Sequence, residues 1–153
     1  MNADFLKKVA LFRGLDDLQL AGILMLGIVR ELEEGQLVFE EKSAGDRFFI
    51  IYDGAVRISK VLANVGEEAL SILRAGDFFG EMSFFDELPR SARAIAQEPT
   101  KLLEIDNSKL KEHFERHPEV AVRFLTAFGQ TLSRRIRETN NKFSSLFTIA
   151  RIF

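Results

Sequence analysis

The stretch GDFFGEMSFFDELPRSARA occupies residues 76–94 and decides how the rest of the chain is interpreted. Within it, Phe78 and Phe79 end a strand-like run, and Gly80 follows them. Glycine permits a positive φ or a close approach of the backbone, so an unusual conformation is expected at this glycine. Residues 81–85 can then form one helical turn, whose unbonded N–H groups attract an anion.

Three polar side chains in this stretch suit a nucleotide. The guanidinium of Arg90 matches the geometry of phosphate oxygens, and Ser91 adds a hydroxyl and an N–H group. Glu81 is a hydrogen-bond acceptor, and acceptors suit sugar hydroxyls. The stretch therefore offers donors for one phosphodiester beside an acceptor for a ribose. From the residues alone, an ordinary loop closed by an Arg90–Glu81 ion pair is the alternative.

The same stretch resembles the phosphate-binding cassette of the cyclic nucleotide-binding domain family. In that family, a Gly-Glu pair, a short apolar helix and an arginine followed by small residues surround the cyclic phosphate. The matching positions here are Gly80, Glu81, Met82, Ser83, Pro89, Arg90, Ser91 and Ala92. The family's glycine framework is matched by Gly35, Gly45-Asp46, Asp53-Gly54 and Gly76-Asp77, so the resemblance covers nearly the whole chain.

The resemblance implies a complete set of ligand-binding residues. The set is Phe79, Gly80, Glu81, Met82, Ser83, Arg90, Ser91, Ala92, Thr139 and Asn140. In the implied roles, Glu81 accepts from the ribose 2′-hydroxyl and Arg90 pairs with an equatorial phosphate oxygen. Ser91 and the N–H groups near Ser83 and Ala92 complete the phosphate cradle. The implied ligand is cAMP, with cGMP and cyclic dinucleotides left open, and no cofactor is expected.

Short strands broken by glycines are predicted in the middle of the chain. They cover Leu37–Glu41, Arg47–Tyr52, Ala55–Leu62, Glu67–Leu73, Ala92–Gln97 and Thr100–Ile105. Asp53-Gly54 separates two of them directly, which is a hairpin signal. Strands this short, with turns this frequent, predict a jelly-roll β-barrel. The first 30 residues are predicted to be helical, with Asp16 or Asp17 as a helix cap.

The spacing of apolar residues changes to a helical period from Asn107 onward. Asn107 or Ser108 is expected to cap a short helix ending near His117, and Pro118 to begin a long one. A heptad seam follows, made of Leu132, Ile136, Phe143, Leu146, Ala150 and Phe153 with Thr139 inserted. This seam predicts a parallel homodimer, whereas the earlier Phe124, Leu125 and Phe128 are expected to face the barrel.

The expected fold class is therefore α+β, mainly β, in one domain over residues 1–153. Its parts are N-terminal helices in 1–30, a β-barrel in 31–106 with the cassette at 78–94, and C-terminal helices in 107–153.

The long C-terminal helix resembles the dimer helix of bacterial cAMP-receptor transcription factors. In those proteins a Thr-Ser pair contacts the purine, and one of the two residues reaches across the dimer. Thr139 and Asn140 occupy these positions, and asparagine in place of serine leaves the base selectivity open. The helix-turn-helix that follows this helix in the family has no counterpart in residues 1–153, so the sequence is either a stand-alone module or a fragment of something longer, and direct DNA binding is not expected.

Composition excludes several other classes of protein. The chain has no cysteine, which excludes disulfides and thiolate metal sites and fits a cytoplasmic location. The sequence contains no run of about 18 apolar residues, so a membrane-spanning helix is not expected. No phosphate loop or dinucleotide-binding glycine motif occurs, so an enzyme is not expected, and the pair His113 and His117 has no nearby cysteine to build a metal site.

Two interpretations of function follow. In the first, the chain is a sensor that binds a cyclic nucleotide and signals through its C-terminal helix and dimer geometry to an unknown protein. In the second, it is a dimerisation or interaction module whose pocket is degenerate or takes a different ligand. Basic residues outnumber acidic ones in residues 109–153 of an otherwise acidic chain with net charge −2, which leaves nucleic acid as a third, less favoured partner.

Overall fold

Two four-stranded antiparallel sheets form the centre of the molecule in this computed structural model, which describes residues 3–150 and side chains as far as residue 145. One sheet has the order β1 (Gly27–Leu32), β8 (Thr100–Asp106), β3 (Arg47–Asp53), β6 (Phe78–Phe79). The other has the order β2 (Leu37–Phe39), β7 (Arg93–Ala96), β4 (Ala55–Leu62), β5 (Gly66–Arg74). The predicted jelly roll is confirmed, although the two sheets are not joined into a closed barrel.

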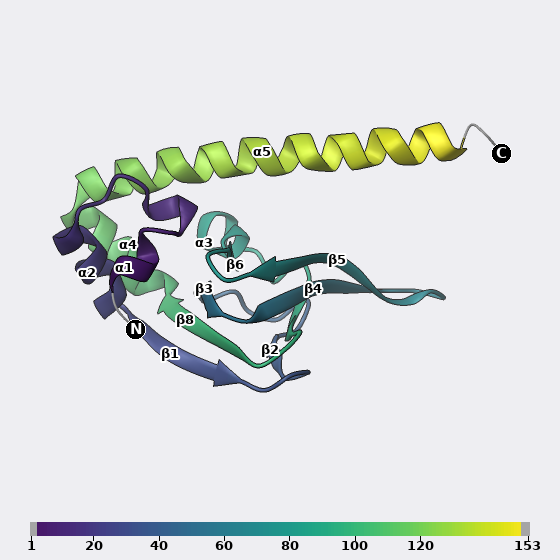
Figure 1. Cartoon of the computed structure of the whole chain (residues 1–153), viewed down its shortest axis with the longest axis horizontal. Coiled ribbons are helices and arrows are strands. Elements are labelled where there is room, and N and C mark those ends of the chain that lie inside the picture. The colour runs from purple at the N-terminus through teal and green to yellow at the C-terminus, as the bar shows by residue number, and fades with distance from the viewer. Residues whose placement is uncertain (1–2, 151–153) are drawn as a thin grey trace.

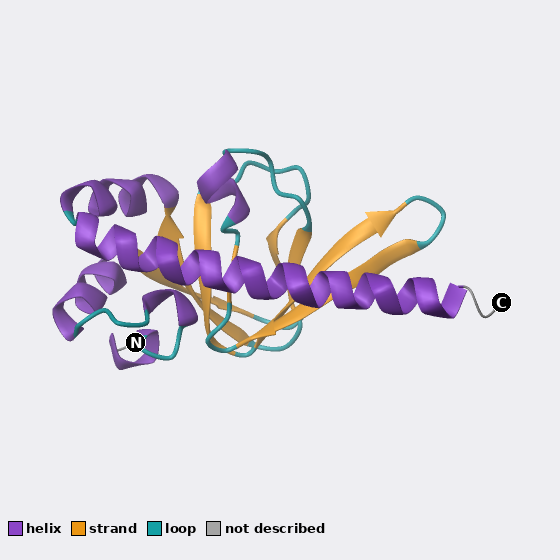
Figure 2. Ribbon diagram, turned by 90° about the horizontal axis from the view of Figure 1, so that it is seen from above, coloured by secondary structure: helices purple, strands orange, loops and turns teal. Residues whose placement is uncertain are grey.

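Helices gather at one end of the jelly roll, as Figures 1 and 2 show. They are α1 (Ala3–Leu6), the 3-10 helix η1 (Ala10–Phe12), α2 (Asp17–Met25), α4 (Asn107–Arg116) and the start of α5 (Pro118–Ala150). From this end α5 runs the length of the molecule and passes over the hairpin of β4 and β5 (Figure 1). The short helix α3 (Met82–Asp86) lies farther along the molecule, next to β6 (Figure 1). No helix of residues 3–150 combines the length and apolar character needed to cross a bilayer.

The prediction of a helical N-terminus was wrong for residues 27–30. These residues begin β1, where Gly27 pairs with Ile105 and Ile28 with Glu104 of β8. Ile28 and Val29 are β-branched, and the neighbouring strand supplies hydrogen-bond partners that a local pattern cannot reveal.

Side chains cap two of the helices. Asp16 caps α2 with a capping box, in which its carboxylate accepts from the N–H of Gln19 at 2.8 Å. Of the two predicted caps, Asp16 and Asp17, the first is therefore confirmed. At α4 the predicted caps were wrong, because Asp106 accepts from the N–H groups of Ser108 and Lys109. Asn107 instead donates its amide Nδ2 to the carbonyl of Gly45 at 3.0 Å.

Phenylalanines divide between two cores because successive strand residues point to opposite faces. On β3, Phe48 faces the helices, where Phe78, Phe84, Phe124 and Phe128 join it. Phe49 faces the second sheet and packs against Phe79 with ring centroids 5.0 Å apart. Of the three α5 residues expected to face the barrel, Phe124 and Phe128 are buried against the helical core, whereas Leu125 is half-exposed.

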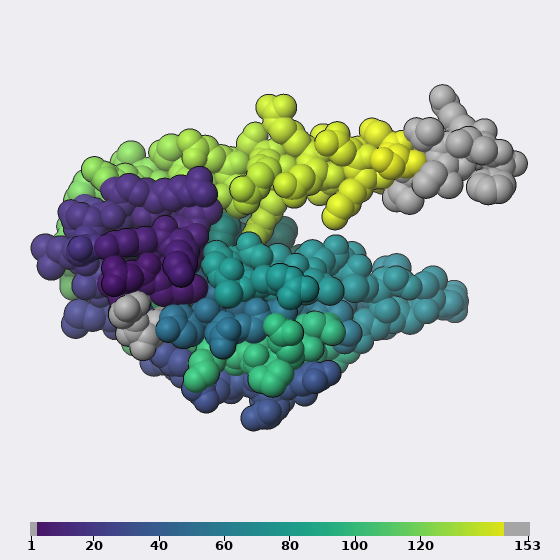
Figure 3. Space-filling view, in the orientation of Figure 1, coloured from purple at the N-terminus to yellow at the C-terminus, as the bar shows by residue number. Residues whose placement is uncertain are grey.

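The far part of α5 leaves apolar side chains uncovered. Ile136 is 57% exposed, and Leu132 and Phe143 of the predicted seam are also accessible. The seam positions Leu146, Ala150 and Phe153 lie outside the residues whose side chains are described. Beneath this part of α5, the surface is hollowed toward the hairpin of β4 and β5 (Figure 3).

Candidate ligand-binding site

A cavity of about 340 Å³ lies between the cassette, strands β4 and β5, and the helix α5. Its lining includes Phe79, Gly80, Glu81, Met82, Ser83, Arg90, Ser91, Ala92 and Thr139. Every residue of the predicted set is therefore at this cavity except Asn140. Asn140 is not among the residues that line the cavity.

Arg90 is buried at the closed end of the cavity, with 4% of its surface exposed. Its Nη1 donates to the carbonyl of Gly80 at 3.1 Å and its Nη2 to the carbonyl of Arg47 at 2.7 Å. The guanidinium lies 4.3 Å from the ring centroid of Phe39, while its Nε is buried without a hydrogen-bond partner. Burial lowers the pKa of this guanidinium, and the more distant carboxylates of Asp46 and Glu81 partly offset the effect.

No carboxylate lies within ion-pair distance of Arg90 among the described side chains. A buried cation is stable only when paired or well hydrogen-bonded, and two carbonyl oxygens leave part of its charge uncompensated. The arrangement can therefore accept an anion. The alternative of a loop closed by an Arg90–Glu81 ion pair does not occur in this structure.

The backbone at Gly80 explains why a glycine precedes the cassette helix. Its φ is +78°, and a Cβ there would lie 2.8 Å from Nη1 of Arg90 and 3.0 Å from the carbonyl oxygen of Arg47. Any side chain would be strained and would also displace the guanidinium. This local geometry brings the carbonyl of Gly80 into contact with Arg90.

Glu81 points to the long helix. Its Oε1 accepts from Nη1 of Arg135 at 2.7 Å, and Nη2 of the same guanidinium donates to the carbonyl of Phe78 at 3.2 Å. Both residues line the cavity, and Glu81 is buried. The pair therefore fastens the cassette to α5 at the point where the cavity closes.

At the start of the short helix α3, the N-cap residue Glu81 makes no side-chain cap, and the N–H of Phe84 donates to the carbonyl of Glu81 at 3.0 Å. The N–H groups that precede Phe84 point toward the N-terminal end of the helix, where an anion is favoured. Ser83 is buried and packs so closely on Gly45 that a Cβ at the glycine would overlap its side chain. Ser91 donates its hydroxyl to the sulfur of Met82 at 3.5 Å. Met82, Ser83 and Ser91 line the cavity together with Arg90.

The open end of the cavity has a different character. Ile58, Leu70 and Leu73 supply an apolar wall from β4 and β5. Opposite them α5 contributes Glu138, Thr139 and Lys142, which lie on the same helix face as Arg135. An apolar wall facing a few polar groups suits a flat, heteroaromatic ring.

Sequence reasoning missed Arg135, Glu138 and Lys142. The sequence contained a signal for these residues, which is their spacing from the predicted site residue Thr139. Arg135 precedes it by four positions, Glu138 by one, and Lys142 follows it by three, so all of them lie near Thr139 on one side of a helix. The two histidines lie with ring centroids 4.6 Å apart, and no group of three or more possible metal ligands occurs among the described residues.

Comparison with known proteins matches residues 29–117 to the model of the cyclic nucleotide-binding domain. A CRP-like cAMP-activated global transcriptional regulator from Mycobacterium tuberculosis is 29% identical over 143 residues, which is 94% of this chain and 62% of that protein. The chain thus spans less than two thirds of this curated relative.

Two crystal structures share both fold and sequence with the chain. The N-terminal domain of a transcriptional regulator from Streptomyces coelicolor A3(2) gives a TM-score of 0.76 at 31% identity, over 92% of this chain and 95% of that one. The catabolite activator protein of Thermus thermophilus gives 0.77 at 31% identity, over 90% of this chain and 62% of that one.

Proposed function

The chain belongs to the cyclic nucleotide-binding domain family, and from this premise we propose that it is a sensor that binds a cyclic nucleotide monophosphate, with cAMP as the ligand. The chain is also similar to cGMP-dependent protein kinases, but over 71% of its length, whereas the match to a cAMP-activated regulator extends over 94%, and this favours cAMP. The domain is then regulatory rather than catalytic, and the nucleotide is its ligand rather than a cofactor.

One observation carries this proposal: the guanidinium of Arg90 is buried at a cavity wall, and among the described side chains no carboxylate lies within ion-pair distance of it. A cyclic phosphate has one negative charge and two free oxygens, which match the fork of an arginine. Each charge-assisted hydrogen bond made there is worth about 1.5–3 kcal/mol. N–H groups of α3 and the hydroxyl of Ser91 would complete the cradle.

The rest of the nucleotide fits the order of groups along the cavity. The ribose lies beside Glu81, whose carboxylate accepts from its 2′-hydroxyl and can do so while still paired with Arg135. The purine then lies between the apolar wall of β4 and β5 and the face of α5 that contains Thr139. Asn140 approaches the base of the other subunit.

Signal output runs through α5. The Glu81–Arg135 pair and the stacked rings of Phe85 and Phe128, 4.2 Å apart, connect the cassette with this helix. A ligand that draws the cassette toward its phosphate therefore shifts the position of α5, to the extent that it binds one arrangement more tightly than the other. The exposed seam of Leu132 and Ile136 makes a parallel homodimer the unit in which such a shift is read out.

Thermal melting tests the proposal. A ligand that binds only the folded state raises the melting temperature as its concentration increases, so cAMP is expected to do so and cGMP to do so less. An unchanged melting temperature with both nucleotides would favour an interaction module with a degenerate pocket. Retention on DNA that falls steeply with salt would favour the basic tail as a nucleic-acid site instead.

A further inference from the structure

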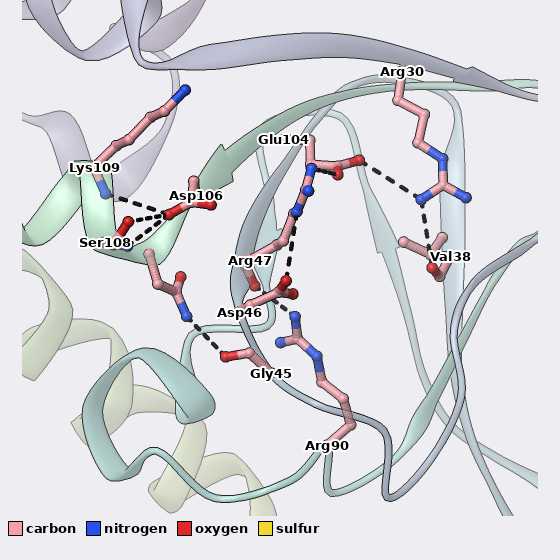
Figure 4. A network of polar contacts seen from close by, with 11 residues as sticks. Arg30, Val38, Gly45, Asp46, Arg47, Arg90, Glu104, Asp106, Ser108 and Lys109 are labelled. Carbon is pink, nitrogen blue, oxygen red and sulfur yellow. Dashed lines mark hydrogen bonds and ion pairs between the residues drawn. The ribbon is translucent and has the colours of Figure 1, made fainter.

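A buried carboxylate lies behind Arg90 and is absent from the lining of the cavity. Glu104 belongs to β8 and is 8% exposed, with its side chain on the face that also holds Leu102. A buried carboxylate costs free energy unless it is paired. Two guanidinium groups pair with it: Nη1 of Arg47 donates to Oε1, and Nη1 of Arg30 lies 3.6 Å from Oε2 (Figure 4).

Arg47 connects this carboxylate to the cavity. Its main-chain carbonyl accepts the 2.7 Å hydrogen bond from Nη2 of Arg90, the shorter of the two bonds that orient that guanidinium. Arg47 is the first residue of β3, where the ladder to β8 begins opposite Asp106. Its neighbour Asp46 lies 3.9 Å away from its Nε and is largely exposed. The side chain of Arg47 is therefore held in place mainly by Glu104.

We propose that Glu104 is a positioning residue for the phosphate site, acting through Arg47 on Arg90. By holding the side chain of Arg47, it fixes the start of β3 and so the carbonyl that aims the guanidinium of Arg90 into the cavity. It also offsets part of the charge of Arg47, so that among the described residues Arg90 is the guanidinium of this network with no carboxylate within ion-pair distance. The inference rests on the proposed binding of a cyclic nucleotide.

Arg30 provides a matched control within the same network. It approaches the same carboxylate, but its remaining hydrogen bonds go to the carbonyls of Leu37 at 3.1 Å and Val38 at 3.5 Å on β2. These contacts join the two sheets and do not include Arg90 (Figure 4). Losing Arg30 therefore weakens the packing of the network while leaving the Arg47 carbonyl in place.

The experiment is a calorimetric titration of cAMP into the wild type and the variants Glu104→Gln, Arg47→Met, Arg30→Met and Arg90→Ala, with the melting temperature of each unliganded variant. Glu104→Gln and Arg47→Met are expected to weaken binding about tenfold, and Arg30→Met less than about twofold, although all three lower the melting temperature. In the double variant Glu104→Gln/Arg47→Met the affinity should equal that of either single variant.

The outcomes separate this inference from the proposed function. If the wild type binds no cAMP, the proposed function fails and the role of Glu104 fails with it. If the wild type binds, Arg90→Ala does not, and Glu104→Gln and Arg47→Met match the wild type, only the positioning role is overturned. Equal losses for Arg30→Met and Arg47→Met would also overturn it. Should Glu104→Gln fail to fold, the half-exposed position Arg47 decides the question alone.

Discussion

Arg135 and Glu81 join the long helix to the cassette through a 2.7 Å hydrogen bond between Nη1 and Oε1. The two residues come from elements far apart in sequence, and both line the cavity that Arg90 also lines. A change at the phosphate end can therefore reach α5 through one buried carboxylate.

Replacing Arg135 by methionine should destabilise the unliganded protein by about 1–3 kcal/mol, because Glu81 is buried and loses its charged donor. Urea unfolding gives the change in the free energy of unfolding. Arg134→Met is the matched control, since its pair with Glu138 is exposed and should be worth less than about 1 kcal/mol. Equal losses for the two variants would contradict the importance of the buried pair.

Two glycines with nearly the same positive φ allow the effect of backbone strain to be distinguished from the effect of a steric clash in the cassette. Gly80 and Gly35 have φ of +78° and +79°, but only Gly80 has atoms where a Cβ would lie. Gly35→Ala should cost about 1 kcal/mol and leave cAMP affinity unchanged, because only the dihedral is strained. Gly80→Ala should cost more and weaken binding by displacing Arg90. Equal stabilities and equal titration curves would refute this account of the turn.

The seam of α5 predicts a dimer. Light scattering at high protein concentration should give twice the mass of one chain, and Ile136→Glu should shift the protein toward monomer, because a charge then lies in an apolar interface. Leu18→Glu is the control, since Leu18 is an exposed leucine of α2, away from the seam. A monomeric wild type, or the same shift in both variants, would contradict the prediction.

The folded protein should lose stability as the pH decreases, because His113 has a lowered pKa in the folded state. Burial lowers the pKa of this imidazole, and the nearby His117 lowers it further, with Glu119 opposing. Because the unfolded chain then binds the proton more readily, stability is complete above about pH 6.5 and declines as the pH drops below it. Melting temperatures measured across this range should decline less in His113→Gln. The same decline in both proteins would exclude this histidine as a cause.

Much of the fold follows from patterns that are local in sequence. Most of the strands between Leu37 and Ile105 are separated by turns that contain glycine, so the antiparallel core of the jelly roll was predictable. Residues 27–30 were not, because their strand exists only as the edge partner of β8, which lies far along the chain. The cap of α4 was missed because Asp106 ends a strand and begins a helix at once.

In the candidate site, too, the residues that lie close together in sequence were predictable, whereas those brought in by tertiary packing were not. The cassette residues from Phe79 to Ala92 lie in one short segment, so their meeting at one cavity follows from the motif. Arg135 was missed because its role depends on where α5 crosses the cassette, which is set by tertiary packing. Glu104 was missed for a related reason, since an acidic residue in a strand usually indicates a solvated face.

The most direct test of the central claim is a calorimetric titration of cAMP into the wild type and into Arg90→Lys. A lysine keeps the positive charge but lacks the planar fork, so the wild type should bind saturably, with one nucleotide per chain, and the variant should lose most of its affinity while retaining its fold. Equal affinities in the two proteins, or no binding to the wild type, would contradict the claim that Arg90 holds a cyclic phosphate.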